Sequence, residues 1–162
     1  MKLHSLLLLA GFAGAAFAQD DTAVRWQRIN GVITAPGINN PVAGIASGGL
    51  PWTTTSGSAG VNFRTGGIFF FVEGLVFAGG QSIGTPGPVA SVTGTLVCNA
   101  GTANQQILDT PAVTLSPEGN AQFSGVFTTI PTCAKPVFLI RTGGRWIAAG
   151  AVPTFTSASE GN

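Results

Sequence analysis

Glycine and proline interrupt this sequence so often that a helix longer than a turn or two has no room to form. The chain holds 24 glycines and 10 prolines in 162 residues, and they recur between short runs rich in Val, Ile, Phe and Thr. After the first 18 residues, no stretch places apolar residues at the spacing of an amphipathic helix. Short apolar runs separated by turn residues are typical of an all-β domain.

Nine runs have the composition of β-strands, and two looser segments separate them. The predicted strands are Val24–Thr34, Gly60–Arg64, Gly67–Val76, Ala90–Cys98, Gln106–Asp109, Ala112–Leu115, Ala121–Phe127, Pro136–Arg141 and Arg145–Val152. Segment 35–59 is rich in proline and small residues, and we expect Trp52 to anchor it onto the body of the domain. Segment 79–88 is either a functional loop or a connection that crosses from one sheet to the other.

Three short segments predict hairpin turns. RTGG occurs at 64–67 and again at 141–144, each time between two predicted strands. A glycine in each copy can adopt the left-handed conformation that a tight turn requires, so we expect the same turn twice. SPEGN at 116–120 predicts a third hairpin, joining Ala112–Leu115 to Ala121–Phe127.

The N-terminus has the pattern of a secretory signal peptide. Lys2 and His4 precede an apolar run that is too short to span a bilayer, and small residues follow as far as Ala16-Phe17-Ala18. We therefore expect residues 1–18 to be a signal peptide and the mature protein, starting at Gln19, to be secreted, either to the periplasm or to the medium. A retained N-terminal anchor is the alternative. The mature chain, 19–162, is predicted to be one domain with a frayed tail from about residue 153.

Cys98 and Cys133 are the two cysteines of the chain. In an exported protein such a pair predicts a disulfide, although two buried free thiols are the alternative. About nine short strands with long crossovers predict a β-sandwich closed by this bridge, and a closed β-barrel is the alternative.

The charge of the chain excludes two classes of partner. Loss of Lys2 with the leader leaves six of the seven Lys and Arg residues against six Asp and Glu residues. No basic stripe or polybasic patch is present, so neither nucleic acid nor an anionic membrane surface is an expected partner.

Few catalytic chemistries fit the mature sequence. The single histidine, His4, leaves with the leader, and the chain has no tyrosine. Histidine-activated nucleophiles and histidine metal sites are thereby excluded, and paired cysteines would exclude thiolate chemistry. No Asp-rich calcium loop or nucleotide-binding glycine motif is present, so we predict no metal and no cofactor.

Carboxylate chemistry is what remains, with Glu73 and Asp109 as a hypothetical hydrolase pair. Simpler interpretations exist for each acid. We expect Glu118 to be a solvated turn residue, and Asp109 to bond its own backbone before Pro111.

The segment FRTGGIFFFVEGLVF, residues 63–77, decides how Glu73 is interpreted. Side chains alternate along a strand, so Ile68, Phe70 and Val72 should share one face. Phe69, Phe71 and Glu73 should share the other face, followed by Leu75 and Phe77. A buried unpaired carboxylate is costly, so the face with Glu73 is predicted to point outward, with Arg64 across the hairpin as its partner.

That assignment leaves Phe69 and Phe71 on an outer face. We expect segment 35–59 to cover them with Leu50 and Trp52. The alternative is an exposed aromatic stripe that serves as a contact surface.

A resemblance extends beyond these local patterns. The segments GGQSIGTPGPVASVTGTLVCNAGTANQQILDTP, AQFSG and PTCAKPVFLIRTGGRWIAAGAV together resemble a group of uncharacterised secreted bacterial proteins. The resemblance covers most of the mature chain, from near Arg25 to Val152. It implies export and a small β-rich domain, and it brings no activity, ligand or catalytic residue.

The sequence thus favours a secreted, non-catalytic protein that acts through surface contacts with an extracellular protein or glycan. A small-ligand or glycan-binding module is the second hypothesis, with Trp52, Phe69, Phe71 and Trp146 as stacking residues, and Trp26 in the core. A hydrolase using Glu73 and Asp109 is the third.

Overall fold

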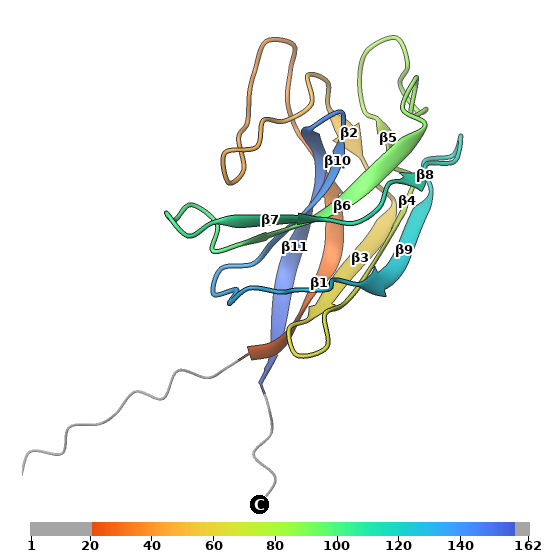
Figure 1. The fold of residues 1–162 in the computed structure, drawn as a ribbon. Helices are drawn as coiled ribbons and strands as arrows, with labels where there is room; N and C mark the ends of the chain where they lie inside the picture. Colours follow the sequence, from red (N-terminus) through yellow and green to blue (C-terminus); the bar gives the residue numbers. More distant parts are fainter. Residues whose placement is uncertain (1–20, 158–162) are drawn as a thin grey trace, which may run out of the picture.

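A computed structural model describes residues 21–157 of the chain. It contains eleven strands and no helix within that range. The strands are β1 (Asp21–Gly31), β2 (Trp52–Thr53), β3 (Ser56–Asn62), β4 (Gly67–Glu73), β5 (Val76–Phe77), β6 (Ser91–Cys98), β7 (Gln106–Asp109), β8 (Val113–Thr114), β9 (Ala121–Val126), β10 (Val137–Thr142) and β11 (Arg145–Ser157) (Figure 1). The predicted signal peptide, residues 1–18, lies outside the described residues.

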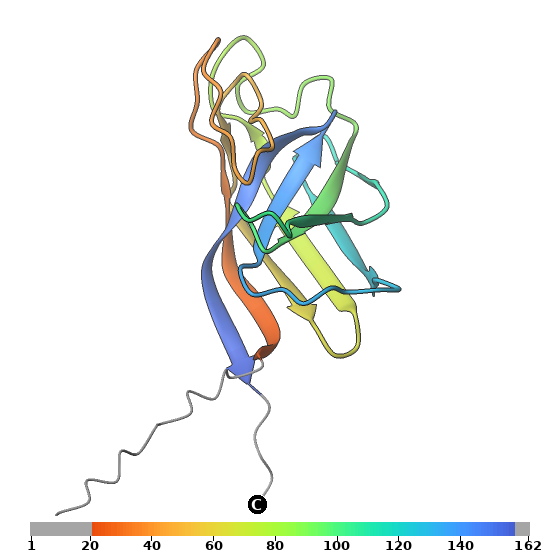
Figure 2. The same cartoon turned by 60° about the vertical axis from the view of Figure 1, so that its left-hand side comes forward.

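Nine of these strands form one antiparallel sheet. Their order is β7-β6-β10-β11-β1-β3-β4-β9, and β8 joins the same sheet by pairing with β6. The sheet curls so that its two halves face each other, which the two views of the ribbon show (Figures 1 and 2). The all-β class and the approximate number of strands are confirmed. The facing layers of the predicted sandwich are parts of one sheet, joined along β11 and β1.

The core fills the space inside this curl. Trp26 of β1, Phe70 of β4 and Phe138 of β10 are all fully buried. The Phe138 ring centre lies 5.6 Å from that of Trp26 and 5.7 Å from that of Phe70, so one aromatic cluster links the two halves of the sheet. The expected core position of Trp26 is confirmed.

The last strand is longer than the sequence indicated. β11 continues to Ser157, and its residues 153–157 pair with the first residues of β1, as in Trp26↔Pro153 and Asp21↔Ser157. The expectation of a frayed tail from about residue 153 is therefore wrong up to Ser157. The segment is exposed, including its one large apolar side chain, Phe155, so backbone pairing with β1 rather than burial holds it in place.

Segment 35–59 contains structure that the sequence did not reveal. β2 lies in this segment and pairs with β5, outside it, as a separate two-stranded sheet, Trp52↔Phe77 and Thr53↔Val76. Trp52 is buried, and its ring centre lies 4.1 Å from that of Phe77. The prediction that Trp52 anchors this segment is confirmed.

The two RTGG copies form different turns, contrary to our expectation. In the second copy Thr142 pairs with Arg145, and Gly143 and Gly144, both at positive φ, make a two-residue turn. In the first copy the pairing of β3 with β4 stops earlier, and residues 63–66 form a longer loop that ends with Gly66 at φ 77°. The loop depends on the preceding Asn62, whose side-chain oxygen accepts hydrogen bonds from two backbone amides in it.

SPEGN forms a turn, but the strands beside it do not pair with each other. The Gly119 amide donates to the Ser116 carbonyl at 2.8 Å, which closes the turn. β8 then pairs with β6, whereas β9 pairs with β4. The predicted hairpin is wrong, because the turn connects β8, which pairs near one edge of the sheet, to β9, which forms the opposite edge.

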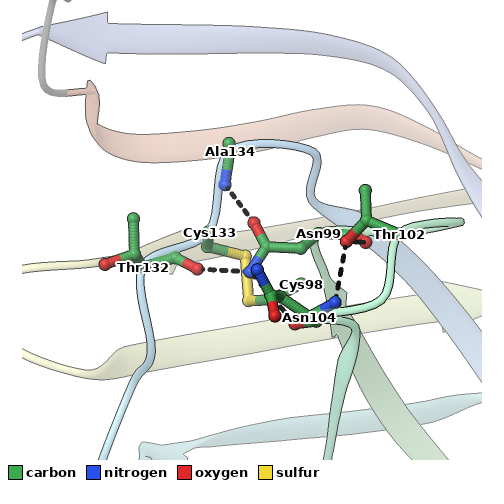
Figure 3. Close-up of a disulfide and its surroundings, with 7 residues drawn as sticks. All are labelled: Cys98, Asn99, Thr102, Asn104, Thr132, Cys133 and Ala134. Atoms are coloured by element: carbon green, nitrogen blue, oxygen red, sulfur yellow. Dashed lines mark hydrogen bonds between the residues drawn. A yellow bond between two sulfur atoms is a disulfide. The ribbon is translucent and has the colours of Figure 1, made fainter.

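The predicted disulfide between Cys98 and Cys133 is present. It connects the end of β6 to segment 127–136, which leads from β9 to β10 (Figure 3). Asn99 supports the bridge on both sides of Cys133: its side-chain amide donates to the Thr132 carbonyl at 2.7 Å, and its side-chain oxygen accepts from the Ala134 amide at 3.0 Å. The bridge thus fastens the connection from the edge strand β9 to the inner strand β10 onto the end of β6.

Candidate binding surface

The outward side of strands β1, β3, β4 and β9 is the candidate site. Ile68, Phe70 and Val72 of β4 are buried, and Phe71 on the opposite side is 38% exposed. Phe69 is half-buried and Glu73 is exposed. The predicted alternation of β4 is therefore confirmed.

Pairing registers place the neighbours of the two phenylalanines on this side. Gly60 and Ser124 flank Phe69, and Ser58 and Gln122 flank Phe71. Arg25 of β1 lies opposite Gly60. We call the set of Arg25, Ser58, Gly60, Phe69, Phe71, Gln122 and Ser124 the Phe face.

The Phe69 ring packs against the sheet because Gly60 has no side chain. A Cβ atom at Gly60 would lie 2.5 Å from a ring atom of Phe69, closer than real contacts allow. The Arg25 guanidinium carbon lies 5.6 Å from the centre of the same ring, within cation–π range. Arg25, Gly60, Phe69 and Ser124 together line an open hollow of about 430 Å³.

Phe71 lies between two polar neighbours. A second hollow, of about 560 Å³, is lined by Phe71, Ser58 and Arg25 and extends beside residues 27–30 of β1. Ser58 is almost fully buried, and its hydroxyl has no hydrogen-bond partner among the described residues. The Phe face therefore combines aromatic area with a cation and short polar side chains.

The expected cover over the two phenylalanines is absent from the described part of the chain. Trp52 packs on Phe77. Leu50 lies against Gly80: a Cβ atom added to Gly80 would be 3.7 Å from the Leu50 side chain. Gly74, at φ 62°, ends the alternation of β4 and turns the chain, so Leu75 and Phe77 are buried. Our placement of Leu75 and Phe77 on the outer face is wrong for this reason, and Trp52 follows Phe77 away from Phe69 and Phe71.

The two tryptophans named as stacking residues lie elsewhere. Trp52 is 4% exposed, and Trp146 is 8% exposed. The Trp146 indole donates a hydrogen bond to the Asn40 carbonyl at 2.8 Å, so it fixes part of segment 35–59. Of the four predicted surface residues, Phe69 and Phe71 are the two that the fold places side by side on the Phe face.

Glu73 lies at the end of β4 beside the Phe face. Its carboxylate accepts a hydrogen bond from the Ser56 hydroxyl, directly across the β3–β4 pair. The predicted partner, Arg64, is in the loop at the other end of the same hairpin. The prediction of a Glu73–Arg64 pair is wrong. Glu73 is the last residue of β4, so it lies at the end of the hairpin farthest from the turn that holds Arg64.

Asp109 is bound to groups on two neighbouring strands. It accepts a hydrogen bond from the Thr95 hydroxyl at 2.6 Å and forms an ion pair with Arg141 at 3.1 Å. Thr110, next to it, is the residue that bonds the local backbone: its hydroxyl donates to the Pro111 carbonyl. The expectation that Asp109 bonds its own backbone is wrong.

Glu118 is fully exposed in the SPEGN turn, as expected. Hydrogen bonds from the Ser116 side chain, and then from the backbone amide of Glu118, lower the pKa of its carboxyl below the ordinary value. Within residues 21–157, no three His, Cys, Asp or Glu side chains lie close enough to hold a metal ion.

The role of Arg25 on the Phe face was missed by the sequence analysis. Alternation predicts that Arg25 points away from the core, because Trp26 is a core residue. Its contact with Phe69 depends on the pairing of β1 with β3, and no sequence signal specifies that pairing.

Comparison with known proteins identifies no relative of this chain. No family model matches it, and neither curated proteins nor solved structures show significant similarity. Among the described residues, no helix has the length and apolar character needed to cross a membrane.

Proposed function

We propose that this is a secreted, non-catalytic binding protein whose contact surface is the Phe face. The observation that carries the proposal is the position of Phe69 and Phe71, side by side on an outward sheet face, with no loop of residues 21–157 over them. Aromatic area left in water forgoes the free energy that burial would provide, so such residues commonly mark a contact surface.

The charge on the Phe face supports recognition of a partner. Arg25, stacked on Phe69, supplies one cation, and Glu73 supplies an anion near Phe71. Aromatic residues and arginine are enriched in the energetically important part of protein interfaces. A partner that covers the Phe face would bury both rings and meet one charge of each sign.

A non-catalytic role agrees with the surroundings of the acids. Glu73 is bonded to Ser56, and Asp109 to Thr95 and Arg141, in strands at opposite parts of the sheet order. Glycoside hydrolysis needs two carboxyl groups on either side of one bond. The third hypothesis, a hydrolase, gains no support from this arrangement.

Glycan binding is the second candidate function, and the hollow beside Phe69 favours it. There an aromatic ring, a guanidinium group and the Ser124 hydroxyl face the same open space. Binding sites for small ligands commonly combine an apolar wall with a few polar groups that fix orientation.

The test of the proposal is binding of labelled mature protein, residues 19–162, to the envelope of the producing cells and to a glycan array. The double variant Phe69→Ser/Phe71→Ser should lose binding and keep its fold by circular dichroism. The matched control is Ile33→Ser/Ile83→Ser, which removes two other exposed apolar side chains (89% and 63% exposed) and should bind normally. Equal binding by both double variants would contradict the assignment of the Phe face.

Export is tested separately. Mass spectrometry of the protein recovered from the medium or periplasm should give the mass of a chain starting at Gln19 with one disulfide. A full-length chain retained in the cytoplasm would contradict the proposed location.

A further inference from the structure

The two edges of the nine-stranded sheet differ in how they are protected. At one end, β7 has four residues, Asp109 is paired with Arg141, and Pro111 lies two residues beyond the strand. Short length, charge and proline are the devices by which edge strands avoid pairing with other chains. At the other end, β9 has six residues and contains neither a charged residue nor proline. The uncharged stretch extends from Gly119 to Ala134.

β9 presents unpaired backbone groups at this edge. The Phe127 amide donates to the Gly66 carbonyl at 3.0 Å, which fixes the phase of hydrogen bonding between β9 and β4. Because bonded pairs alternate along an antiparallel ladder, Ala121, Phe123 and Gly125 bond to β4. The N–H and C=O groups of Gln122, Ser124 and Val126 therefore point away from the sheet, and β4 is the one strand with which β9 pairs in the described range.

From these observations we infer that β9 pairs with β9 of a second copy of this chain, forming an antiparallel dimer about a twofold axis at Ser124. An antiparallel strand with outward groups at three alternate positions is complementary to itself. Ser124 faces Ser124 of the other copy, and Gln122 faces Val126. Each of these three facing pairs exchanges two hydrogen bonds, about six in all.

A second copy suits this edge better than a strand of unrelated sequence. The stretch from Gly119 to Ala134 carries no charge, so two identical copies meet without like-charge repulsion. Val126 is 70% exposed, and its cross-strand neighbour on β4 is Gly67, which offers no side chain to cover it. Pairing places Gln122 of the second copy beside Val126. An open hollow of about 470 Å³, lined by Val113, Thr114, Ala121 and Gln122, lies beside this position, and the Val126 side chain of that copy would lie next to it.

The dimer would extend the Phe face. With the twofold axis perpendicular to the sheet, the outer faces of both copies lie on the same side. Phe71 of the two copies would be separated by three strand spacings, about 14 Å across the strands. The inferred dimer does not depend on the proposed function, because its formation needs no partner other than the chain itself.

The first test is sedimentation of the mature protein over a dilution series. The wild-type chain should sediment with twice the monomer mass, and Ser124→Lys, which places two like charges opposite each other, should be monomeric. Its urea midpoint should equal that of the wild type diluted until it is monomeric, because dimer formation itself raises the midpoint of the wild type. Gln27→Lys adds the same charge on the exposed outer side of β1 and should remain dimeric. A monomeric wild-type protein, or a dimeric Ser124→Lys variant, would overturn the inference.

The second test is a cross-link, which remains informative if Ser124→Lys folds poorly. Directly bonded antiparallel residues have Cα atoms about 5.5 Å apart, within the range that a disulfide spans. Ser124→Cys should therefore form a covalent dimer on mild oxidation. Ala78→Cys, at another exposed position, should give far less. Equal yields from the two variants would contradict pairing at Ser124.

Discussion

Phe70→Ala should be among the most destabilising substitutions in this protein, whereas Phe71→Ala, one position along, should be mild. Phe70 is 1% exposed, and its ring centre lies 6.2 Å from that of Phe123 and 5.7 Å from that of Phe138. Replacing a buried phenylalanine by alanine costs roughly 3–5 kcal/mol of unfolding free energy, depending on how far the site can collapse.

The surroundings of Phe70 place the cost in the upper part of that range. The ring lies against Gly94 of β6, which has no side chain that could move into the space. β6 is itself held by pairing with β10 on one side and with β7 and β8 on the other. We therefore expect a loss of about 4 kcal/mol for Phe70→Ala. Because Phe71 is 38% exposed, it loses less burial, and we expect about 1 kcal/mol for Phe71→Ala.

The measurement is urea unfolding of the wild type and of Phe69→Ala, Phe70→Ala and Phe71→Ala, with the m-value checked for constancy. The predicted order of loss is Phe70 first, then Phe69 and Phe71. Equal large losses at all three positions would refute the outward assignment of Phe69 and Phe71. A small loss at Phe70 would refute the packing between the two halves of the sheet.

A companion variant tests the same contact from the other side. A Cβ atom at Gly94 would lie 2.6 Å from the Phe70 ring, so Gly94→Ala should cost about 1–3 kcal/mol through overpacking. In a Phe70→Leu background the added methyl group has more room, and the two changes should cost less together than the sum of their separate losses. Additive losses would show that the ring and Gly94 are not in contact.

Three further predictions concern the charged residues and the disulfide. Glu73→Gln should change the free energy of unfolding, measured by thermal unfolding, by about 0–1 kcal/mol, because the carboxylate is exposed. If the purified protein had a hydrolytic activity that this variant lost, the non-catalytic assignment would be contradicted. Cys98 and Cys133 enclose a sequence separation of 35 residues, so reduction should cost about 3–4 kcal/mol of stability, and alkylation of the non-reduced protein should detect no thiol. In an NMR titration, the carboxyl of Glu118 should have a pKa below its ordinary value, and that pKa should rise in Ser116→Ala. Because the pKa is lower in the folded state than in the unfolded state, the contribution of Glu118 to stability is present above the unfolded pKa. That contribution is lost as the pH falls through the folded pKa.

The candidate site shows which parts of a surface a sequence can specify. Alternation identified the sides of Phe69, Phe70 and Phe71 correctly, because a strand has a period of two wherever it pairs. The second hypothesis also named Trp52 and Trp146 as surface stacking residues, although both are buried. Their positions follow from contacts with segments far away in the chain, which composition does not encode.

By itself, the sequence determined the properties that arise between near neighbours in the chain. The recurring glycines and prolines excluded helices, and the runs of Val, Ile and Phe located most strands to within a few residues. The two cysteines predicted the disulfide, because the N-terminal pattern indicated export and exported proteins commonly pair their cysteines.

Only the tertiary structure decided which strands pair. RTGG forms two different turns, SPEGN joins strands with different partners, and Arg25 stacks on Phe69 through the pairing of β1 with β3. The hydrogen bonds that join strands are made by backbone groups that nearly every residue carries, so they leave little trace in side-chain identity. Partner choice, and with it the curl of the sheet and the open edge at β9, is therefore settled by how the whole set of strands buries its apolar sides together.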